Sequence, residues 1–148
     1  MADFPTRLEY NAGLENAPGD PFGRTELVIE ADGTARLVHK HVGAVHTWTA
    51  KVDVATLRAV WAELERGGFP EIPKHPVPGG SAMRTLLAHV GHEKQGGQIA
   101  WNAAAKLPGF HEAFAMLDSI VRQISEDSVQ AAPNTLPLVV TAIVRLTN

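Results

Sequence analysis

The sequence predicts one α+β domain in which a mainly antiparallel β-sheet carries two amphipathic helices packed on one face. Segments with period-two alternation come in pairs joined by short glycine-containing turns, which is typical of antiparallel hairpins. Two longer segments repeat apolar residues at helical spacing. The order of these segments, β-β-β-β-α-β-β-α-β, favours two layers over separate domains.

Length and composition agree with a single folded domain over residues 1–148. The chain is 45% hydrophobic and 20% charged, which is ordinary for a globular protein. It contains no cysteine, which excludes disulfides, thiolate nucleophiles and cysteine-based metal sites. Neither a dinucleotide-binding glycine motif nor a phosphate-binding Walker loop occurs. We therefore expect no cofactor of those classes and lean away from an enzyme.

Charge and hydropathy limit the partners and the location. The net charge is −3 and no basic stripe is present, so we expect no nucleic-acid partner. The first residues lack the pattern of a signal peptide. The longest apolar stretch, Leu136 to Val144, is too short to span a bilayer, so we expect no membrane partner. These features together predict a cytoplasmic protein.

The first half of the chain predicts four strands. Residues 1–6 are expected to be a loose end, 7–10 a short strand and 11–23 a loop. Alternating runs at 25–30 and 34–41 flank Ala31-Asp32-Gly33, which predicts a hairpin with Gly33 in the left-handed conformation. A three-residue loop places Ile29 opposite Ala35 and keeps one face apolar, whereas a two-residue loop places Ile29 opposite Arg36.

A further strand at 44–52 turns around Val42-Gly43. It places Leu37 opposite Trp48 and His39 opposite His46. A helix then follows, because Asp53 is a good N-cap and Gly67-Gly68 is a common C-terminal signal. The buried stripe of this helix is predicted to comprise Val54, Leu57, Val60, Trp61 and Leu64.

The second half predicts a stiff proline-rich loop over 70–80, a hairpin, a helix and a final strand. The hairpin strands are expected at 83–90 and 98–102, joined by a turn containing glycine and lysine. Pro108 or Gly109 opens the helix. Its apolar stripe is Phe110, Ala113, Phe114, Leu117, Ile120, Val121 and Ile124.

The tail over 136–147 predicts an added C-terminal strand. Every even position from Leu138 to Leu146 is apolar, and β-branched residues dominate. Because an exposed apolar strand invites association, this strand must pair with something. It adds either to the sheet of its own domain or to that of a partner subunit, and the sequence leaves both open.

Three histidines form the candidate metal site. His39, His41 and His46 are predicted on one face around the second hairpin, with cross-strand neighbours roughly 5 Å apart. Three imidazoles in this arrangement could hold zinc or nickel with water in the open position. Alternatively, they sense pH or line the solvated end of a hairpin.

A second candidate surface would bind a partner protein. Prolines pre-order an extended segment and lower the entropy lost on docking. Trp101 follows a predicted strand end, and tryptophan is enriched at binding hot spots. This candidate surface comprises His75, Pro76, Val77, Pro78 and Trp101.

The middle of the chain, roughly residues 24–124, resembles emfourin-like domains, which are small bacterial α+β proteins that include inhibitors of thermolysin-like metalloproteases. The resemblance follows turn and core positions in order. These are Asp32-Gly33, Val54-Ala55-Thr56-Leu57-Arg58, Leu64, Gly68-Phe69-Pro70-Glu71-Ile72-Pro73, Pro78-Gly79-Gly80-Ser81, Trp101 and Leu107-Pro108. The long N-terminal loop and the added final strand depart from the pattern, and no inhibitory residue is carried over.

These observations predict a non-catalytic binding domain, with protein as its partner. The resemblance implies a metalloprotease as that partner. The first alternative is a histidine-based metal-binding protein or metalloenzyme that uses zinc or nickel. The second is a structural subunit that self-associates through its C-terminal strand.

Overall fold

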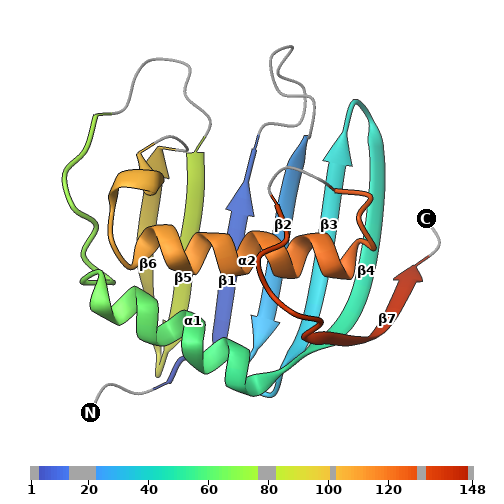
Figure 1. Cartoon of the computed structure of the whole chain (residues 1–148), viewed down its shortest axis with the longest axis horizontal. Coiled ribbons are helices and arrows are strands. Elements are labelled where there is room, and N and C mark those ends of the chain that lie inside the picture. Colours follow the sequence, from blue (N-terminus) through green and yellow to red (C-terminus); the bar gives the residue numbers. More distant parts are fainter. Residues whose placement is uncertain (1–3, 14–22, 77–82, 101–102, 130–132, 147–148) are drawn as a thin grey trace.

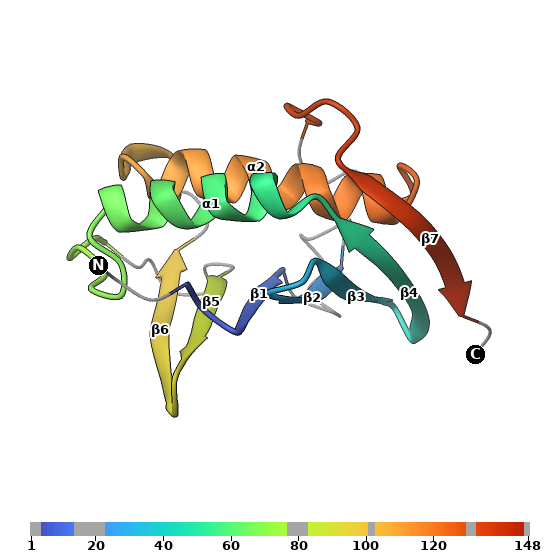
Figure 2. The same cartoon turned by 90° about the horizontal axis from the view of Figure 1, so that it is seen from below.

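A computed structural model describes residues 4–13, 23–76, 83–100, 103–129 and 133–146. It confirms the α+β class: a seven-stranded antiparallel sheet of order β6-β5-β1-β2-β3-β4-β7 carries two helices on one face (Figures 1 and 2). The strands are β1 (Arg7–Ala12), β2 (Arg24–Glu30), β3 (Thr34–His41), β4 (Ala44–Val52), β5 (Met83–Val90), β6 (Glu93–Ala100) and β7 (Val140–Leu146). The helices are α1 (Val54–Arg66), the short 3-10 turn η1 (Ala104–Lys106) and α2 (Phe110–Ile124).

The β2–β3 hairpin has the predicted register. Ile29 pairs with Ala35 and Leu27 with Leu37 across the sheet. Gly33 adopts φ 93°, and its carbonyl accepts a hydrogen bond from the Val52 amide at 2.8 Å. A Cβ at Gly33 would stand 2.3 Å from the Val52 oxygen, so glycine is needed both for its backbone conformation and for this close approach.

The β3–β4 pairing is also as predicted. Leu37 lies opposite Trp48, Ala35 opposite Ala50 and His39 opposite His46. Leu37 and Trp48 are buried beneath the helices, so the apolar face of the sheet continues from β2 to β4. The opposite face of the sheet carries ion pairs such as Lys40 to Glu26 at 3.1 Å.

Helix α1 begins and ends at the expected residues. The Asp53 carboxylate accepts from the Ala55 amide at 3.4 Å. At the other end, the Gly68 amide donates to Glu65 and the Phe69 amide to Leu64, which is the Schellman pattern around a left-handed glycine. Of the predicted stripe, Val54 is half-buried and the other four residues are buried.

Helix α2 buries all seven residues of its predicted stripe. It lies across the sheet beside α1, so both helices cover the same face (Figure 2). Gly109, the residue before α2, adopts φ 84° and sits against the end of α1. Among the described residues, no helix is long and apolar enough to cross a membrane.

Several boundaries differ from the sequence expectation. Strand β1 continues to Ala12, two residues into the expected loop over 11–23, and β2 begins at Arg24 rather than at residue 25. Strand β6 begins at Glu93 rather than at residue 98, because its polar residues and Gly96-Gly97 conceal a strand that pairs fully with β5 around a two-residue turn. Gly96 has φ 133°, and a Cβ there would stand 2.0 Å from the Leu86 oxygen. The expected loose end is shorter than residues 1–6, because the Thr6 amide donates to the His89 carbonyl and the Thr6 carbonyl accepts from the Ala31 amide.

The final strand joins the sheet of its own domain, which decides between the two pairings that the sequence left open. Strand β7 begins at Val140 and pairs antiparallel with β4. A bulge interrupts the pairing where Ala142 adopts φ 53°. Val140 contacts the core, whereas Val144 and Leu146 lie opposite Thr49 and Thr47 on the face away from the helices.

Candidate functional site

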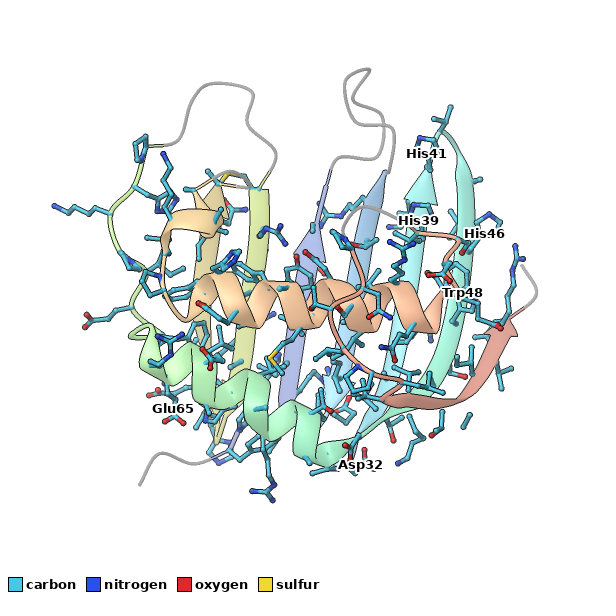
Figure 3. The ribbon with its side chains drawn as sticks, viewed as in Figure 1. Asp32, His39, His41, His46, Trp48 and Glu65 are labelled. Atoms are coloured by element: carbon cyan, nitrogen blue, oxygen red, sulfur yellow. The ribbon has the colours of Figure 1, made fainter. Side chains whose placement is uncertain are left out.

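The three predicted metal-binding histidines lie near one another at the end of the β3–β4 hairpin. His39 and His41 follow Leu37 on the helix-bearing face of β3, and His46 lies opposite His39 on β4. The rings of His39 and His41 are nearly parallel, with centroids 6.2 Å apart. All three side chains are half-exposed, and Figure 3 shows them where the two strands extend past α2.

Arg145 of β7 occupies one of the two ring nitrogens through which His46 could bind a metal ion. Its guanidinium donates a 2.7 Å hydrogen bond to Nδ1 of His46 and lies over the Trp48 ring at 5.9 Å. Because Nδ1 of His46 accepts this hydrogen bond, the ring proton of the neutral imidazole lies on Nε2. The Arg145 guanidinium also repels a metal cation placed beside it. Within the described part of the chain, no three histidine or carboxylate side chains are placed to hold a metal ion.

The geometry therefore fits a zinc or nickel ion poorly, and the metal site stays a prediction of the sequence. Replacing Arg145 with alanine frees Nδ1 of His46 and removes the cation. We expect zinc affinity to rise about tenfold, as measured by titration calorimetry, because one nearby charge contributes about 1–2 kcal/mol at a surface. Arg36→Ala, on the opposite face of β3, is the matched control. An affinity that falls in Arg145→Ala would show that the guanidinium does not oppose the metal.

The predicted partner-binding segment is tied to its own domain at His75. Nδ1 of His75 lies 2.8 Å from the Pro73 carbonyl, and Nε2 accepts from the Ala100 amide at 3.2 Å. Ile72 lies against β6, with its Cδ1 atom 3.1 Å from where a Cβ at Gly97 would stand. The segment thus covers one end of β6. Pro76 is exposed, whereas Val77, Pro78 and Trp101 lie outside the described residues.

A buried polar network joins α2 to the sheet, and the sequence reasoning did not find it. Asp118 of α2 accepts from the Tyr10 hydroxyl at 2.7 Å and from the Arg84 guanidinium at 2.9 Å. Arg84 also contacts the Tyr10 hydroxyl directly. The Phe114 ring stacks on Tyr10 and lies 5.0 Å from the Arg84 guanidinium. The available signal was one charged residue, Arg84, on an otherwise apolar strand face.

Burial raises the pKa of Tyr10 well above its usual range, and the Asp118 charge adds to this effect. The phenol is therefore held protonated as a donor to Asp118. Arg84 and Asp118 are 9% and 11% exposed, so the charges are almost fully withdrawn from water. This arrangement fastens α2 to β1 and β5.

On the open face of the sheet, Glu9, His89 and Lys94 form a smaller polar group. A hydrogen bond with His89 holds the pKa of Glu9 below its usual value, and the charge of Lys94 acts in the same direction. Lys94 lies 3.6 Å from the Glu9 carboxylate. The contacts join β1, β5 and β6 and give the β6 side of the sheet a charged surface.

The two edges of the sheet differ in their protection. The β6 edge has Glu93, Lys94 and two glycines, and the segment ending at His75 covers one end of it. We define the β7 edge as the side of Val140–Leu146 that faces away from β4. Its nearby apolar side chains are exposed, with Leu138 at 78%, Val144 at 53% and Leu146 at 37%. In the described structure, no strand other than β4 pairs with β7.

Comparison with known proteins leaves the identity open. No protein-family model matches this chain. A search among curated proteins likewise gave no match. The resemblance to emfourin-like domains therefore stays an expectation, and the function rests on the site geometry.

Proposed function

We propose that this chain is a non-catalytic protein-binding domain whose β7 edge receives the partner. The observation that carries the proposal is the exposure of Val144 and Leu146 on an edge strand. Natural sheets protect edge strands with charge, proline or a covering segment, since an unprotected edge pairs with other chains. The β6 edge has such protection, whereas the β7 edge, apart from Arg145 and the bulge at Ala142, presents apolar side chains.

The chemistry of this edge suits strand addition. Backbone groups along an edge strand give affinity to any extended segment, and alternate side chains give selectivity. Val144 and Leu146 project on one face, and Arg145 projects on the other toward His46 and Trp48. A partner strand would therefore meet an apolar strip on one face and a single cation on the other.

The partner class to test first is a thermolysin-like metalloprotease, in keeping with the emfourin-like resemblance. We expect the purified chain at micromolar concentration to slow cleavage of a peptide substrate by such a protease. Val144→Lys should weaken this effect by about tenfold or more, because a charge would have to lose water at an apolar contact. The measurement is the inhibition constant from initial rates.

The matched control is Val42→Lys, which makes the same change at a 74% exposed valine in the β3–β4 turn. It should inhibit as well as the unsubstituted chain. If the chain slows cleavage and Val144→Lys slows it equally, the β7 edge is not the binding surface. If it does not slow cleavage at all, a protease of this class is not the partner.

A further inference from the structure

The β7 edge can pair with the same edge of a second copy of this chain. We propose that two copies of this chain pair their β7 strands antiparallel about a two-fold axis that passes beside Val144, which extends the two sheets into one. This inference rests on the proposed function, since it uses the same edge, and it specifies a second copy as the occupant.

The symmetry follows from strand geometry. A two-fold axis perpendicular to the sheet places identical edges side by side and antiparallel. Directly opposed residues in an antiparallel pair have their side chains on the same face. One residue must therefore face its own symmetry mate, and the axis lies midway between those two copies of that residue. The helices of both copies then lie on one side of the joined sheet, and Figures 1 and 2 show neither helix reaching past β7 to obstruct it.

The choice of Val144 follows from the residues after the bulge. An axis at Arg145 would oppose two guanidinium groups, which is unfavourable. An axis at Ile143, which packs partly against the core, would place the bulge at Ala142 opposite Val144 in the middle of the pairing. An axis at Val144 opposes two half-exposed valines and keeps each Arg145 opposite an isoleucine.

Charge and apolar area favour pairing of β7 with β7 of a second copy over pairing of β7 with β6 of a second copy. Across the Val144 axis no like charges face each other, because Arg145 is the only charged residue of β7. The outer face of the junction gathers Val144 and Leu146 from both copies. Pairing of β7 with β6 of another copy would instead bring this apolar strip beside the strand that carries Glu93 and Lys94, at an edge that His75 partly covers.

The bulge at Ala142 limits how far the pairing extends. About an axis at Val144, Leu146 falls opposite the bulged Ala142. Only Ile143, Val144 and Arg145 then pair regularly, so the contact is short. Interfaces of this size fall in the weak, reversible class. We therefore expect association to depend on protein concentration in sedimentation experiments on the full chain, and to be lost in Val144→Lys, where two lysines would face each other at the axis.

Cysteine cross-linking tests the pairing directly, because the chain has no cysteine of its own. In Val144→Cys the two thiols would face each other at the axis, with Cα atoms about 5 Å apart, which a disulfide can bridge. Mild oxidation should yield a species of twice the 15.9 kDa chain mass. Thr141→Cys is the matched control, since it is exposed on the same strand but lies far from its symmetry mate.

The inference is supported if Val144→Cys cross-links readily and Thr141→Cys does not. Equal cross-linking of the two variants, or none in either, overturns it. A chain that self-associates without preferential cross-linking at Val144 also overturns it, because the copies then meet elsewhere. A monomeric chain that still inhibits a protease through Val144 would end this inference and leave the proposed function standing.

Discussion

Replacing Asp118 with alanine is expected to lower the free energy of unfolding by about 3–5 kcal/mol, the range for breaking a buried ion pair from one side. The change leaves the Arg84 guanidinium buried beside Phe114 without its carboxylate, and it removes the acceptor of the Tyr10 hydroxyl. Asp118 and Arg84 are 11% and 9% exposed, so water cannot compensate for the loss. Denaturant unfolding followed by tryptophan fluorescence measures the effect.

Two variants make this expectation specific. Glu30→Ala breaks the exposed ion pair with Arg7 and should cost about 1 kcal/mol or less. A triple variant with apolar replacements of similar shape, Tyr10→Phe, Arg84→Met and Asp118→Leu, should recover most of the stability, since none of these three positions then carries a polar group to leave unpaired. If Asp118→Ala costs no more than Glu30→Ala, the network does not fasten α2 to the sheet.

Replacing Gly109 with alanine is expected to lower the free energy of unfolding by about 2–6 kcal/mol. Gly109 has φ 84° and ψ −53°, a sparsely populated backbone conformation that disfavours any side chain by about 1–3 kcal/mol. A Cβ there would also stand 2.5 Å from the Glu63 oxygen and 2.6 Å from the Gly67 nitrogen. Both atoms are backbone at the end of α1, so α2 would have to move away, and overpacking of this kind costs about 1–3 kcal/mol.

Gly43→Ala separates the two contributions. Gly43 also has a positive φ, 81°, but nothing lies within 4 Å of where its Cβ would stand. It should therefore show only the conformational cost of about 1–2 kcal/mol. Equal destabilisation of the two variants by thermal or denaturant unfolding would mean that the junction of α1 and α2 is not tightly packed at Gly109.

Local pattern was sufficient to predict most of the fold. Asp32-Gly33 and the alternation on either side of it set the β2–β3 register, because a slip of one residue would have exposed Ile29. The stripes of α1 and α2 identified the buried helix faces. Strand β6 was placed too late, since Gly96-Gly97 and its polar neighbours show no apolar alternation and take their conformation from pairing with β5.

Contacts between distant residues could not be predicted from the sequence. Tyr10 and Asp118 are 108 positions apart, and Arg145 and His46 are 99 apart. No local periodicity reports such neighbours, and the one available sign of a buried partner was Arg84 on an otherwise apolar strand face. The contact of Arg145 with His46 changes what the histidine group can bind, so the candidate metal site was the least predictable part.

For the C-terminal tail, the sequence predicted the strand but not its pairing partner. The alternation from Leu138 to Leu146 predicted a strand, and the structure has one at Val140–Leu146. The sequence left the pairing partner open, because β4 and a strand of another copy offer the same backbone groups. Only the pairing with β4 shows which side of β7 is still available, and that side includes the exposed Val144 and Leu146.

The central claim is that the β7 edge binds protein, and amide hydrogen exchange along the full chain tests it most directly. Exchange would be measured at low and high chain concentration, and with a thermolysin-like protease inactivated by zinc removal. We expect amides within Val140–Leu146 to gain protection in at least one of these comparisons, while those of Glu93–Ala100 do not change. Protection gained at β6 instead, or none at β7 under any condition, would contradict the account.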